Sequence, residues 1–419
     1  MIEFIAIGDE LLLGHTVDTN ASWLGRELAA AGYQVTRRVT IGDDFTGIQN
    51  AVREALDRAE VVICSGGLGP TQDDYTKLAV ADLFGARLVV RQDLLDALEE
   101  RYRRRGTPMP SRNITQAEVP EGAQVLPNIR GTAPGLLLRD ARGRRVILLP
   151  GVPHEFRGLV SEQVLPLLRA ELPPRTQPVF YRTLRTTGIP EALVAEKIDD
   201  VLPVIAPLTV AFLPGFEGSD IRLTSWGQLA ADAANAAFDR AETLIRERVG
   251  RWIYGTGRAN LADVVGDLLR SRKLTVRIAE SCTGGLLGKR LTDTAGSSDY
   301  FDRGVVAYSN EAKVELLGVR PETLAAHGAV SEETVREMTI GSLPPGRGAA
   351  IAITGIAGPG GGSAEKPVGT VWLGAALRED GSDRIVTRRV GLPGDREEIR
   401  ERAAQAALAL LWDLLQDQT

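Results

Sequence analysis

The feature that most constrains this chain is a repeated alternation of two patterns. Short runs of apolar, β-favouring residues at 3–8, 33–42 and 61–67 are each followed by a turn and then by a stretch of helical hydrophobic period, such as 19–32 and 45–59. This alternation is typical of β-α-β units, in which helices cover both faces of a parallel sheet. Ligands of such sheets bind at the carboxyl ends of the strands.

The length of 419 residues suits two or three separate hydrophobic cores. Because the pattern changes twice, we predict the α/β class, with two α/β domains joined by a small α+β domain. The first α/β domain, at 1–170, should contain a mostly parallel sheet; the small domain covers 171–253 and the second α/β domain covers 254–419. The small domain carries no cluster of reactive residues, so we expect it to serve as a spacer or in dimerisation.

The composition limits the kinds of partner and cofactor. The chain has 49 Lys and Arg against 55 Asp and Glu residues, and its net charge of −6 argues against direct nucleic-acid binding. Three histidines and two cysteines make a multi-histidine metal site or a disulfide framework improbable, so any metal should sit on carboxylates. The chain shows no signal-peptide pattern and no long apolar run. We therefore expect a cytoplasmic protein with small-molecule partners and no membrane partner.

A candidate nucleophile and base occur in the last domain. Ser281 follows a strand-like run and precedes a helical one, where free helical N–H groups could hold an oxyanion. Taken alone, such a serine is more simply a helix cap. Lys313 is one of only six lysines among the 49 basic residues, and burial can lower the pKa of a lysine so that it acts as a base. Tyr308, at the end of a strand predicted over 304–309, either relays a proton or is an aromatic residue that packs in the core at the end of that strand. His327 lies in a loop-like segment.

Two further features of this domain point to an anion. A glycine-dense stretch at 353–362 follows a predicted strand, and its backbone could approach a phosphate closely. Arg396 lies in the first turn of the predicted last helix, 395–416, where a cation opposes the helix dipole unless an anion compensates it. Pairing of Arg396 with a neighbouring glutamate is the alternative. Together with Ser281 and Lys313, these features predict a nucleophile beside a phosphate site.

Six motifs in this order resemble the C-terminal domain of the CinA family: AESCTGG, AGSSDYFDRGVVAYSNEAK, GAVSEETV, TGIAGPGGG, KPVGTVW and PGDRE. The resemblance implies an amidase that converts nicotinamide mononucleotide to nicotinate mononucleotide and ammonia through an acyl-enzyme, without a cofactor. It would make Ser281 the nucleophile, Lys313 the base and Tyr308 an assistant. The residues that would bind the substrate are Thr283, Gly284, Thr354, Gly355, Ala357, Gly358, Gly360 and Arg396.

Pairs of acidic residues follow three predicted strands of the first domain. They are Asp9 and Glu10, Asp43 and Asp44, and Asp73 and Asp74, the last pair after the glycines Gly66, Gly67 and Gly69. Carboxylates at one sheet edge, beside exposed N–H groups, suit a divalent cation that bridges a phosphate or pyrophosphate, although acidic loop residues are also ordinary. The segment lacks GxGxxG and GxxxxGK[ST], which disfavours dinucleotide or ATP sites of those types.

The motifs GDEL, SGGLGPTQDD and LPGVPHEF resemble molybdopterin-binding domains. With NIRGTAPG at 128–135 and with Asn113 and Gln116, the longer signature is similar to the N-terminal domain of the CinA family, so the resemblance covers nearly the whole chain. It implies a metal-dependent ADP-ribose pyrophosphatase that gives AMP and ribose 5-phosphate. We expect the metal to be Mg, Mn or Co and the protein to form a homodimer. The metal ligands would be Asp43, Asp73 and Asp74, with Asp74 also catalytic, and Gly66, Gly67 and Gly69 would bind phosphate.

The leading hypothesis is therefore a bifunctional hydrolase of pyridine-nucleotide salvage. Two alternatives remain open. One is a molybdopterin-binding or transferase-like protein, which would retain a pterin chromophore on purification. The other is a competence or DNA-damage accessory protein that acts by binding a protein partner, for which Ser281→Ala would leave the phenotype unchanged.

Overall fold

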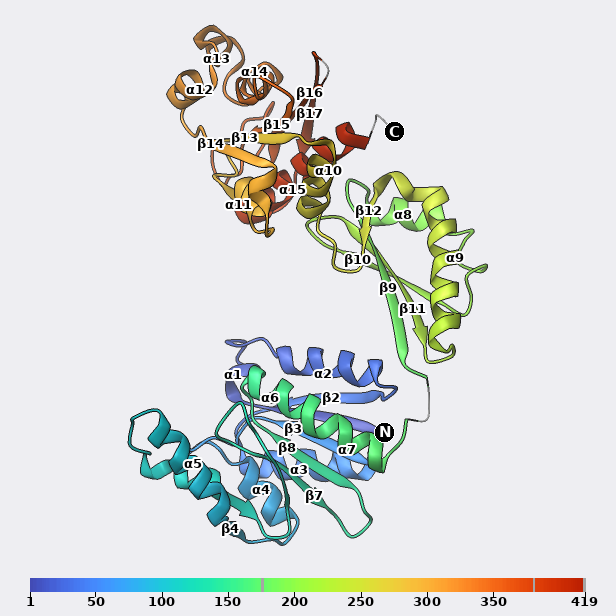
Figure 1. Cartoon of the computed structure of the whole chain (residues 1–419), viewed down its shortest axis with the longest axis vertical. Helices are drawn as coiled ribbons and strands as arrows, with labels where there is room; N and C mark the ends of the chain where they lie inside the picture. Colours follow the sequence, from blue (N-terminus) through green and yellow to red (C-terminus); the bar gives the residue numbers. More distant parts are fainter. Residues whose placement is uncertain (175–176, 380, 417–419) are drawn as a thin grey trace. The chain divides into compact units, whose positions relative to one another are not determined.

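The computed structural model describes residues 1–174, 177–379 and 381–416, and the chain separates into two compact units (Figure 1). The first unit comprises residues 1–180 and 226–231. The second comprises residues 181–225 and the chain from 232 onward. No helix among the described residues has the length and apolar character needed to cross a bilayer.

The first unit is built on a six-stranded sheet with the order β2-β1-β3-β8-β7-β6. The four strands β2, β1, β3 and β8 are parallel, and β7 and β6 are antiparallel to their neighbours. In chain order the strands are β1 (Ile2–Ile7), β2 (Val35–Ile41), β3 (Val61–Ser65), β6 (Gln124–Leu126), β7 (Gly135–Arg139) and β8 (Arg145–Leu149). The predicted mostly parallel α/β sheet is confirmed.

Helices bury both faces of this sheet, as the continuous apolar runs of its strands require. Along β1, Phe4 faces α2 (Thr19–Ala30), α6 (Pro153–Leu159) and α7 (Leu165–Glu171), whereas the next residue, Ile5, faces α3 (Phe45–Arg58) and α4 (Thr76–Leu83). The shorter elements are α1 (Asp9–Leu12), the β4–β5 pair (Leu88–Val90 and Glu118–Pro120), α5 (Gln92–Arg104), the 3-10 helix η1 (Ser111–Ala117) and the π-helical turn η2 (Val160–Val164).

The second unit begins with a small four-stranded sheet of order β10-β11-β9-β12. Its strands are β9 (Val179–Thr186), β10 (Thr209–Pro214), β11 (Ser219–Trp226) and β12 (Ile253–Thr256), accompanied by α8 (Glu191–Ile198), α9 (Ala231–Val249) and the 3-10 turn η3 (Gly250–Trp252). This part has the α+β character expected from the sequence.

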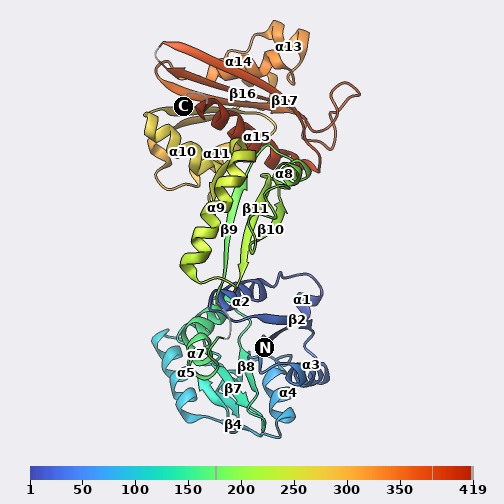
Figure 2. The same ribbon diagram turned by 90° about the vertical axis from the view of Figure 1, so that its right-hand side faces the viewer.

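The rest of the second unit is a five-stranded sheet of order β14-β13-β15-β16-β17. Strands β13 (Thr275–Glu280), β14 (Phe301–Val306) and β15 (Gly348–Gly355) are parallel, and β16 (Thr370–Glu379) and β17 (Ser382–Gly391) continue it antiparallel. The helices α10 (Leu261–Arg272), α11 (Leu286–Thr292) and α15 (Arg396–Gln416) cover one face, and α12 (Asn310–Leu317), α13 (Pro321–His327) and α14 (Glu332–Ser342) lie at the other (Figures 1 and 2). The 3-10 turn η4 (Ser297–Asp299) precedes β14.

One predicted strand is displaced. The strand predicted over 304–309 includes Tyr308, but β14 spans Phe301–Val306, so Tyr308 lies beyond the end of the strand. Because β14 is an edge strand, it accommodates the charged Asp302 and Arg303, which interrupt the apolar pattern. Ser309 then caps α12 by accepting a hydrogen bond from the Ala312 N–H, which leaves residues 307 and 308 to make the turn.

Candidate functional site

The structure brings Ser281 and Lys313 together in the second unit. Ser281 directly follows β13, and its N–H donates to the Ile353 carbonyl of β15 at 3.0 Å, which attaches it to the middle of the sheet. Lys313 lies in α12, the helix that follows the neighbouring strand β14 in the chain. The Lys313 Nζ is 3.1 Å from the Ser281 Oγ, and the two residues are only 1% and 8% exposed. A hydroxyl and an amine are thus in hydrogen-bond contact and shielded from water.

The surroundings of Lys313 combine burial with several hydrogen-bond acceptors. Its Nζ lies 2.9 Å from the Ala307 carbonyl oxygen, 3.2 Å from that of Tyr308 and 3.4 Å from that of Ser309. Burial lowers the pKa of Lys313, since the charged form loses its hydration. A neutral amine has two N–H groups, which can donate to carbonyls, and one lone pair, which can accept the Ser281 proton. Lys313 can therefore act as a base for Ser281.

Glu280 organises the turn that follows Ser281, a role that sequence reasoning missed. Its side chain is 1% exposed and accepts hydrogen bonds from the N–H groups of Gly285, Leu287 and Gly288 at 3.0, 3.1 and 2.8 Å. The expectation that free N–H groups at the helix start hold an oxyanion is therefore wrong: α11 starts only at Leu286, and Glu280 occupies them. The signal in the sequence was an acidic residue at the end of an otherwise apolar strand.

Two other N–H groups remain beside the nucleophile. Those of Cys282 and Thr283 donate to no atom in the described part of the chain, and the Thr283 hydroxyl, fully buried, has no partner there either. The Thr283 carbonyl accepts a hydrogen bond from the Arg400 Nη2 at 2.7 Å, which fixes the turn to α15. Gly284 lies in the same turn with a φ of +57°, a conformation that favours glycine. The free N–H groups next to Ser281 are the better candidates for an oxyanion site.

Cys282 is a further potential nucleophile in this turn, and its environment keeps it inactive. Burial raises the pKa of the Cys282 thiol to about 11, so the thiol stays protonated at neutral pH.

His327, the other candidate base, lies at the end of α13 with its Nδ1 3.5 Å from a Glu333 carboxylate oxygen, and it makes no hydrogen bond with Ser281. The geometry therefore favours the serine and lysine pair.

Tyr308 and Arg396 connect this pair to the glycine-dense loop. The Tyr308 side chain is 58% exposed, and its hydroxyl accepts a hydrogen bond from the Arg396 Nη2 at 2.9 Å; only its carbonyl contacts Lys313. Arg396 Nη1 donates to the Gly358 carbonyl at 2.7 Å. Arg396 makes no ion pair with a neighbouring glutamate in the described part of the chain, so three of its five N–H groups remain for an anion.

Only some of the predicted phosphate-binding residues line a common hollow. Ala357, Gly358 and Arg396 line a hollow of about 480 Å³, which Pro359, Val368 and residues 394–397 complete. The Thr354 hydroxyl instead donates to the Ala329 carbonyl at 2.7 Å. Gly355 is needed for packing, since a Cβ there would lie 2.7 Å from the Val371 side chain. Gly360 has open space around it and does not line the hollow.

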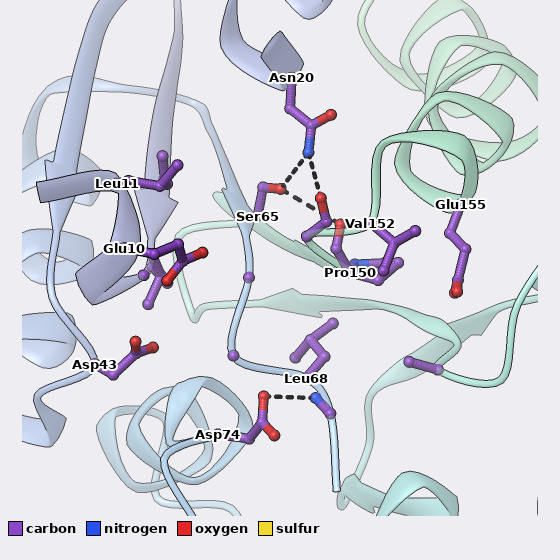
Figure 3. Close-up of a pocket in the computed structure, with 18 of the residues that line it drawn as sticks. Glu10, Leu11, Asn20, Asp43, Ser65, Leu68, Asp74, Pro150, Val152 and Glu155 are labelled. Atoms are coloured by element: carbon purple, nitrogen blue, oxygen red, sulfur yellow. Dashed lines mark hydrogen bonds between the residues drawn. The ribbon is translucent and has the colours of Figure 1, made fainter. Parts of the chain in front are cut away.

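A cleft of about 580 Å³ lies at the carboxyl ends of β1, β3 and β8 in the first unit (Figure 3). We refer to it as the N-terminal cleft. Its charged side chains are all acidic: Glu10, Asp18, Asp43, Asp73, Asp74 and Glu155. No Lys, Arg or His occurs among the described residues that line it. The position at the strand ends agrees with the location expected from the sequence.

The three predicted phosphate-binding glycines differ in what their N–H groups do. The Gly66 N–H donates to the Leu149 carbonyl at 3.0 Å, and a Cβ at this position would lie 2.1 Å from the Ile7 carbonyl oxygen. The Gly69 N–H donates to the Asp74 carboxylate at 2.7 Å (Figure 3). The N–H groups of Gly67 and Leu68 donate to nothing in the described part of the chain. Gly67 and Leu68 are therefore the anion-binding candidates, and sequence reasoning missed Leu68.

The predicted metal ligands are also not equivalent. Asp74 accepts hydrogen bonds from the N–H groups of Gly69 and Thr71, both at 2.7 Å, and from the Thr71 hydroxyl. Its carboxylate therefore stabilises the loop that contains it. Asp43 accepts from the Asp9 N–H at 3.0 Å; burial raises the pKa of Asp43, and nearby acidic side chains raise it further. Among the residues that the structure describes, no three His, Cys, Asp or Glu side chains are grouped as a metal site, so Asp43, Asp73 and Asp74 are not assembled as one.

Sequence comparison covers the whole chain. The family patterns described as a probable molybdopterin binding domain, a damage-inducible protein CinA KH domain and a CinA C-terminal domain match residues 3–170, 181–255 and 258–415. A CinA-like protein of Gemmatimonas aurantiaca is 50% identical over 409 residues, which cover 97% of this chain and 94% of the relative. The chain belongs to the CinA family. The family assignment from the motifs is thereby confirmed.

Further similar proteins include one more relative over the full length and one solved structure over part of the chain. A CinA-like protein of Chloroherpeton thalassium is 41% identical over 420 residues and covers 99% of both chains. The crystal structure of the competence/damage inducible protein CihA from Agrobacterium tumefaciens is 45% identical; it covers 37% of this chain and 94% of that one, with a TM-score of 0.36.

The role of Glu280 predicts a loss of stability on Glu280→Gln. A glutamine keeps the shape but turns an N–H donor toward buried backbone N–H groups, and an unsatisfied buried donor costs about 1–3 kcal/mol. We expect the free energy of unfolding of the second unit to fall by about this amount in urea titrations followed by tryptophan fluorescence. Glu397→Gln, at an exposed position in α15, is the matched control and should leave the transition unchanged; an unchanged midpoint for Glu280→Gln would contradict the role.

Proposed function

We propose that the C-terminal domain hydrolyses the carboxamide of nicotinamide mononucleotide to nicotinate mononucleotide and ammonia. The observation that carries this proposal is the 3.1 Å contact between the Lys313 Nζ and the Ser281 Oγ in a buried setting. An amide needs an activated nucleophile, and a serine hydroxyl becomes one when a neighbouring base accepts its proton.

The residues suggest the following proton movements. The Ser281 oxygen attacks the carboxamide carbon while its proton passes to Lys313, and the N–H groups of Cys282 and Thr283 stabilise the oxyanion that forms. The carbon–nitrogen bond then breaks, and the Lys313 ammonium gives its proton to the leaving ammonia, which leaves an acyl group on Ser281. Lys313 next accepts a proton from water as water attacks the acyl carbon. It returns this proton to the Ser281 oxygen when the carboxylic acid product departs.

The substrate phosphate finds its partner in Arg396. The hollow lined by Ala357, Gly358 and Arg396 is joined to the nucleophile by the contact of Arg396 with Tyr308, whose carbonyl contacts Lys313. A guanidinium with N–H groups to spare is the usual protein partner of a phosphate. In this proposal Tyr308 holds Arg396 in position and transfers no proton.

For the N-terminal cleft we propose metal-dependent hydrolysis of ADP-ribose to AMP and ribose 5-phosphate. Among the described residues, six carboxylates and no basic side chain line the cleft, so a diphosphate would be repelled unless a cation lay between the charges. Mg²⁺ commonly takes only one or two protein carboxylates together with phosphate oxygens and water, so two carboxylates of the cleft would be enough for such a cation.

The residues that would hold this cation are Asp43 and Asp73. Asp74 would shape the loop from Gly69 to Thr71, and the free N–H groups of Gly67 and Leu68 would contact phosphate oxygens. When bound, a divalent cation supplies charge neutralisation and an activated water. Homodimer formation and a cytoplasmic location remain predictions from the sequence.

The decisive experiment on the amidase compares Ser281→Ala and Lys313→Arg with the wild type. Both variants should lower kcat for ammonia release from nicotinamide mononucleotide by about 100-fold or more, because one removes the nucleophile and the other replaces the base by a group that keeps its proton. Hydrolysis of ADP-ribose by the same preparations is the internal control and should be retained. A Lys313→Arg protein with the wild-type rate would refute the pair.

The lowered pKa of Lys313 also predicts the pH dependence of the amidase. Since the base acts only when deprotonated, kcat/KM should rise with pH and level off above the Lys313 pKa, which lies below the value of about 10.4 for an ordinary lysine. Cys282→Ala should leave the profile unchanged, because burial already keeps that thiol protonated up to a pKa of about 11. A rate that falls over the same pH range would contradict the assignment of Lys313.

The cation proposal predicts that Asp43→Asn raises the Mg²⁺ or Mn²⁺ concentration for half-maximal ADP-ribose hydrolysis by about tenfold. EDTA should stop this reaction while ammonia release from nicotinamide mononucleotide continues. Glu99→Gln, which changes an exposed acidic residue of α5, serves as the control and should behave as wild type. ADP-ribose hydrolysis that persists in EDTA would eliminate the cation.

A further inference from the structure

A second hollow, of about 410 Å³, adjoins the N-terminal cleft. It lies between α5 and the segment 125–134, and we refer to it as the side hollow. Gln116 and Thr132 line both the side hollow and the cleft, so one ligand can extend from one space into the other. None of the predicted site residues lies in the side hollow.

Of the two residues that line both spaces, Gln116 has the more informative environment. It lies near the end of η1 and is only 5% exposed, yet its buried carboxamide oxygen Oε1 has no hydrogen-bond partner among the residues that the structure describes. The neighbouring carboxamides are satisfied: the Asn113 Nδ2 donates to the Tyr102 hydroxyl at 2.6 Å, and the Asn128 Nδ2 donates to the Ala133 carbonyl at 2.8 Å. A buried amide oxygen without a donor is costly, so this oxygen beside two open spaces indicates a ligand that donates a hydrogen bond to it.

The walls of the side hollow are mainly apolar. The apolar residues that line it are Leu94, Ala97, Leu98, Val125, Pro127, Ile129 and Pro134. Ile129 is 75% exposed, so a flat ligand against it would remove apolar surface from water. Polar side chains, among them Gln116, Asn128 and Thr132, stand beside these apolar residues, and such a mixture suits a flat base that has polar edges.

The charged residues of the side hollow already have partners. Arg91 pairs with Asp93 at 2.7 Å, and the Arg101 Nη1 donates to the Gly131 carbonyl. The Arg91–Asp93 pair is neutral overall, and Arg101 keeps further N–H groups that can donate to a ring nitrogen or a ribose oxygen of a ligand. The phosphates of the same ligand would stay in the N-terminal cleft, near the free N–H groups of Gly67 and Leu68.

We propose that the side hollow binds the adenine base of a nucleotide whose phosphates lie in the N-terminal cleft, with the Gln116 carboxamide paired to the base edge. A carboxamide offers one acceptor next to one donor, which matches the 6-amino group and the adjacent ring nitrogen of adenine. A half-turn of the amide exchanges its oxygen and nitrogen, so either atom can face the base. The adenine identity rests on the proposed hydrolysis of ADP-ribose.

The test measures binding of AMP to the full chain by titration calorimetry in the presence of Mg²⁺. Wild type should bind AMP about tenfold more tightly than purine riboside 5′-monophosphate, which lacks the 6-amino group; this is about 1.4 kcal/mol. Gln116→Leu should bind AMP about tenfold more weakly and should no longer distinguish the two nucleotides. Gln92→Leu makes the same substitution at an exposed position of α5 outside the side hollow and should match the wild type.

A second variant guards against an effect of Gln116 on folding. Ala97 is an exposed residue of α5 that lines the side hollow, so Ala97→Phe should fill the space without disturbing the core, and its melting temperature should equal that of the wild type. We expect this variant to lose at least tenfold in AMP affinity. Wild type that binds the two nucleotides equally or not at all, or wild-type AMP affinity in both Gln116→Leu and Ala97→Phe, would overturn the base site.

The two proposals for the N-terminal domain fail in different ways. If AMP binding depends on Gln116 but the wild type does not hydrolyse ADP-ribose, the base site stands and the hydrolase proposal fails. If ADP-ribose is hydrolysed with wild-type kcat/KM by both Gln116→Leu and Ala97→Phe, the hydrolase proposal stands and the base site is refuted.

Discussion

The burial of one amine beside one hydroxyl is the interaction on which the C-terminal site depends. Lys313 is enclosed by the carbonyls of the turn before α12, and its contact with Ser281 places a base next to a nucleophile at the end of strand β13. Glu280 captures the N–H groups at the start of α11 and so fixes the turn after Ser281. This arrangement explains why the N–H groups of Cys282 and Thr283, and not those of the helix, are open toward the nucleophile.

The two units place different sets of charged side chains at the ends of their sheets. All charged side chains among the described residues that line the N-terminal cleft are carboxylates, whereas the hollow of the C-terminal domain has the guanidinium of Arg396 beside the carboxylates of Asp395 and Glu397. An anionic nucleotide therefore needs a cation in the first case and can meet a guanidinium directly in the second. Both proposed substrates are phosphorylated compounds, and this difference in charge accounts for proposing a metal in only one site.

Local pattern was sufficient to predict much of the fold and part of the sites. Hydrophobic period indicated the α/β class, and the scarcity of lysine drew attention to Lys313. The position of β14 was wrong by three residues, because an edge strand accepts charged residues that interrupt the pattern. The roles of Gly66 and Gly69 could not be predicted either. Their N–H groups donate hydrogen bonds to Leu149 and Asp74, and a sequence pattern does not show which groups form hydrogen bonds in the folded chain.

The sequence by itself determined which residue types stand at the strand ends, and its motifs determined the family. Only the tertiary structure decided which of them meet: that Lys313 contacts Ser281 across 32 positions and that Asp74 binds the backbone of its own loop. It also decided that the Gln116 Oε1 has no partner among the described residues where it lies between two open spaces. The physical reason is that hydrophobic period is a local property of the chain, whereas hydrogen-bond partners and burial depend on segments brought together by the packing of the sheets.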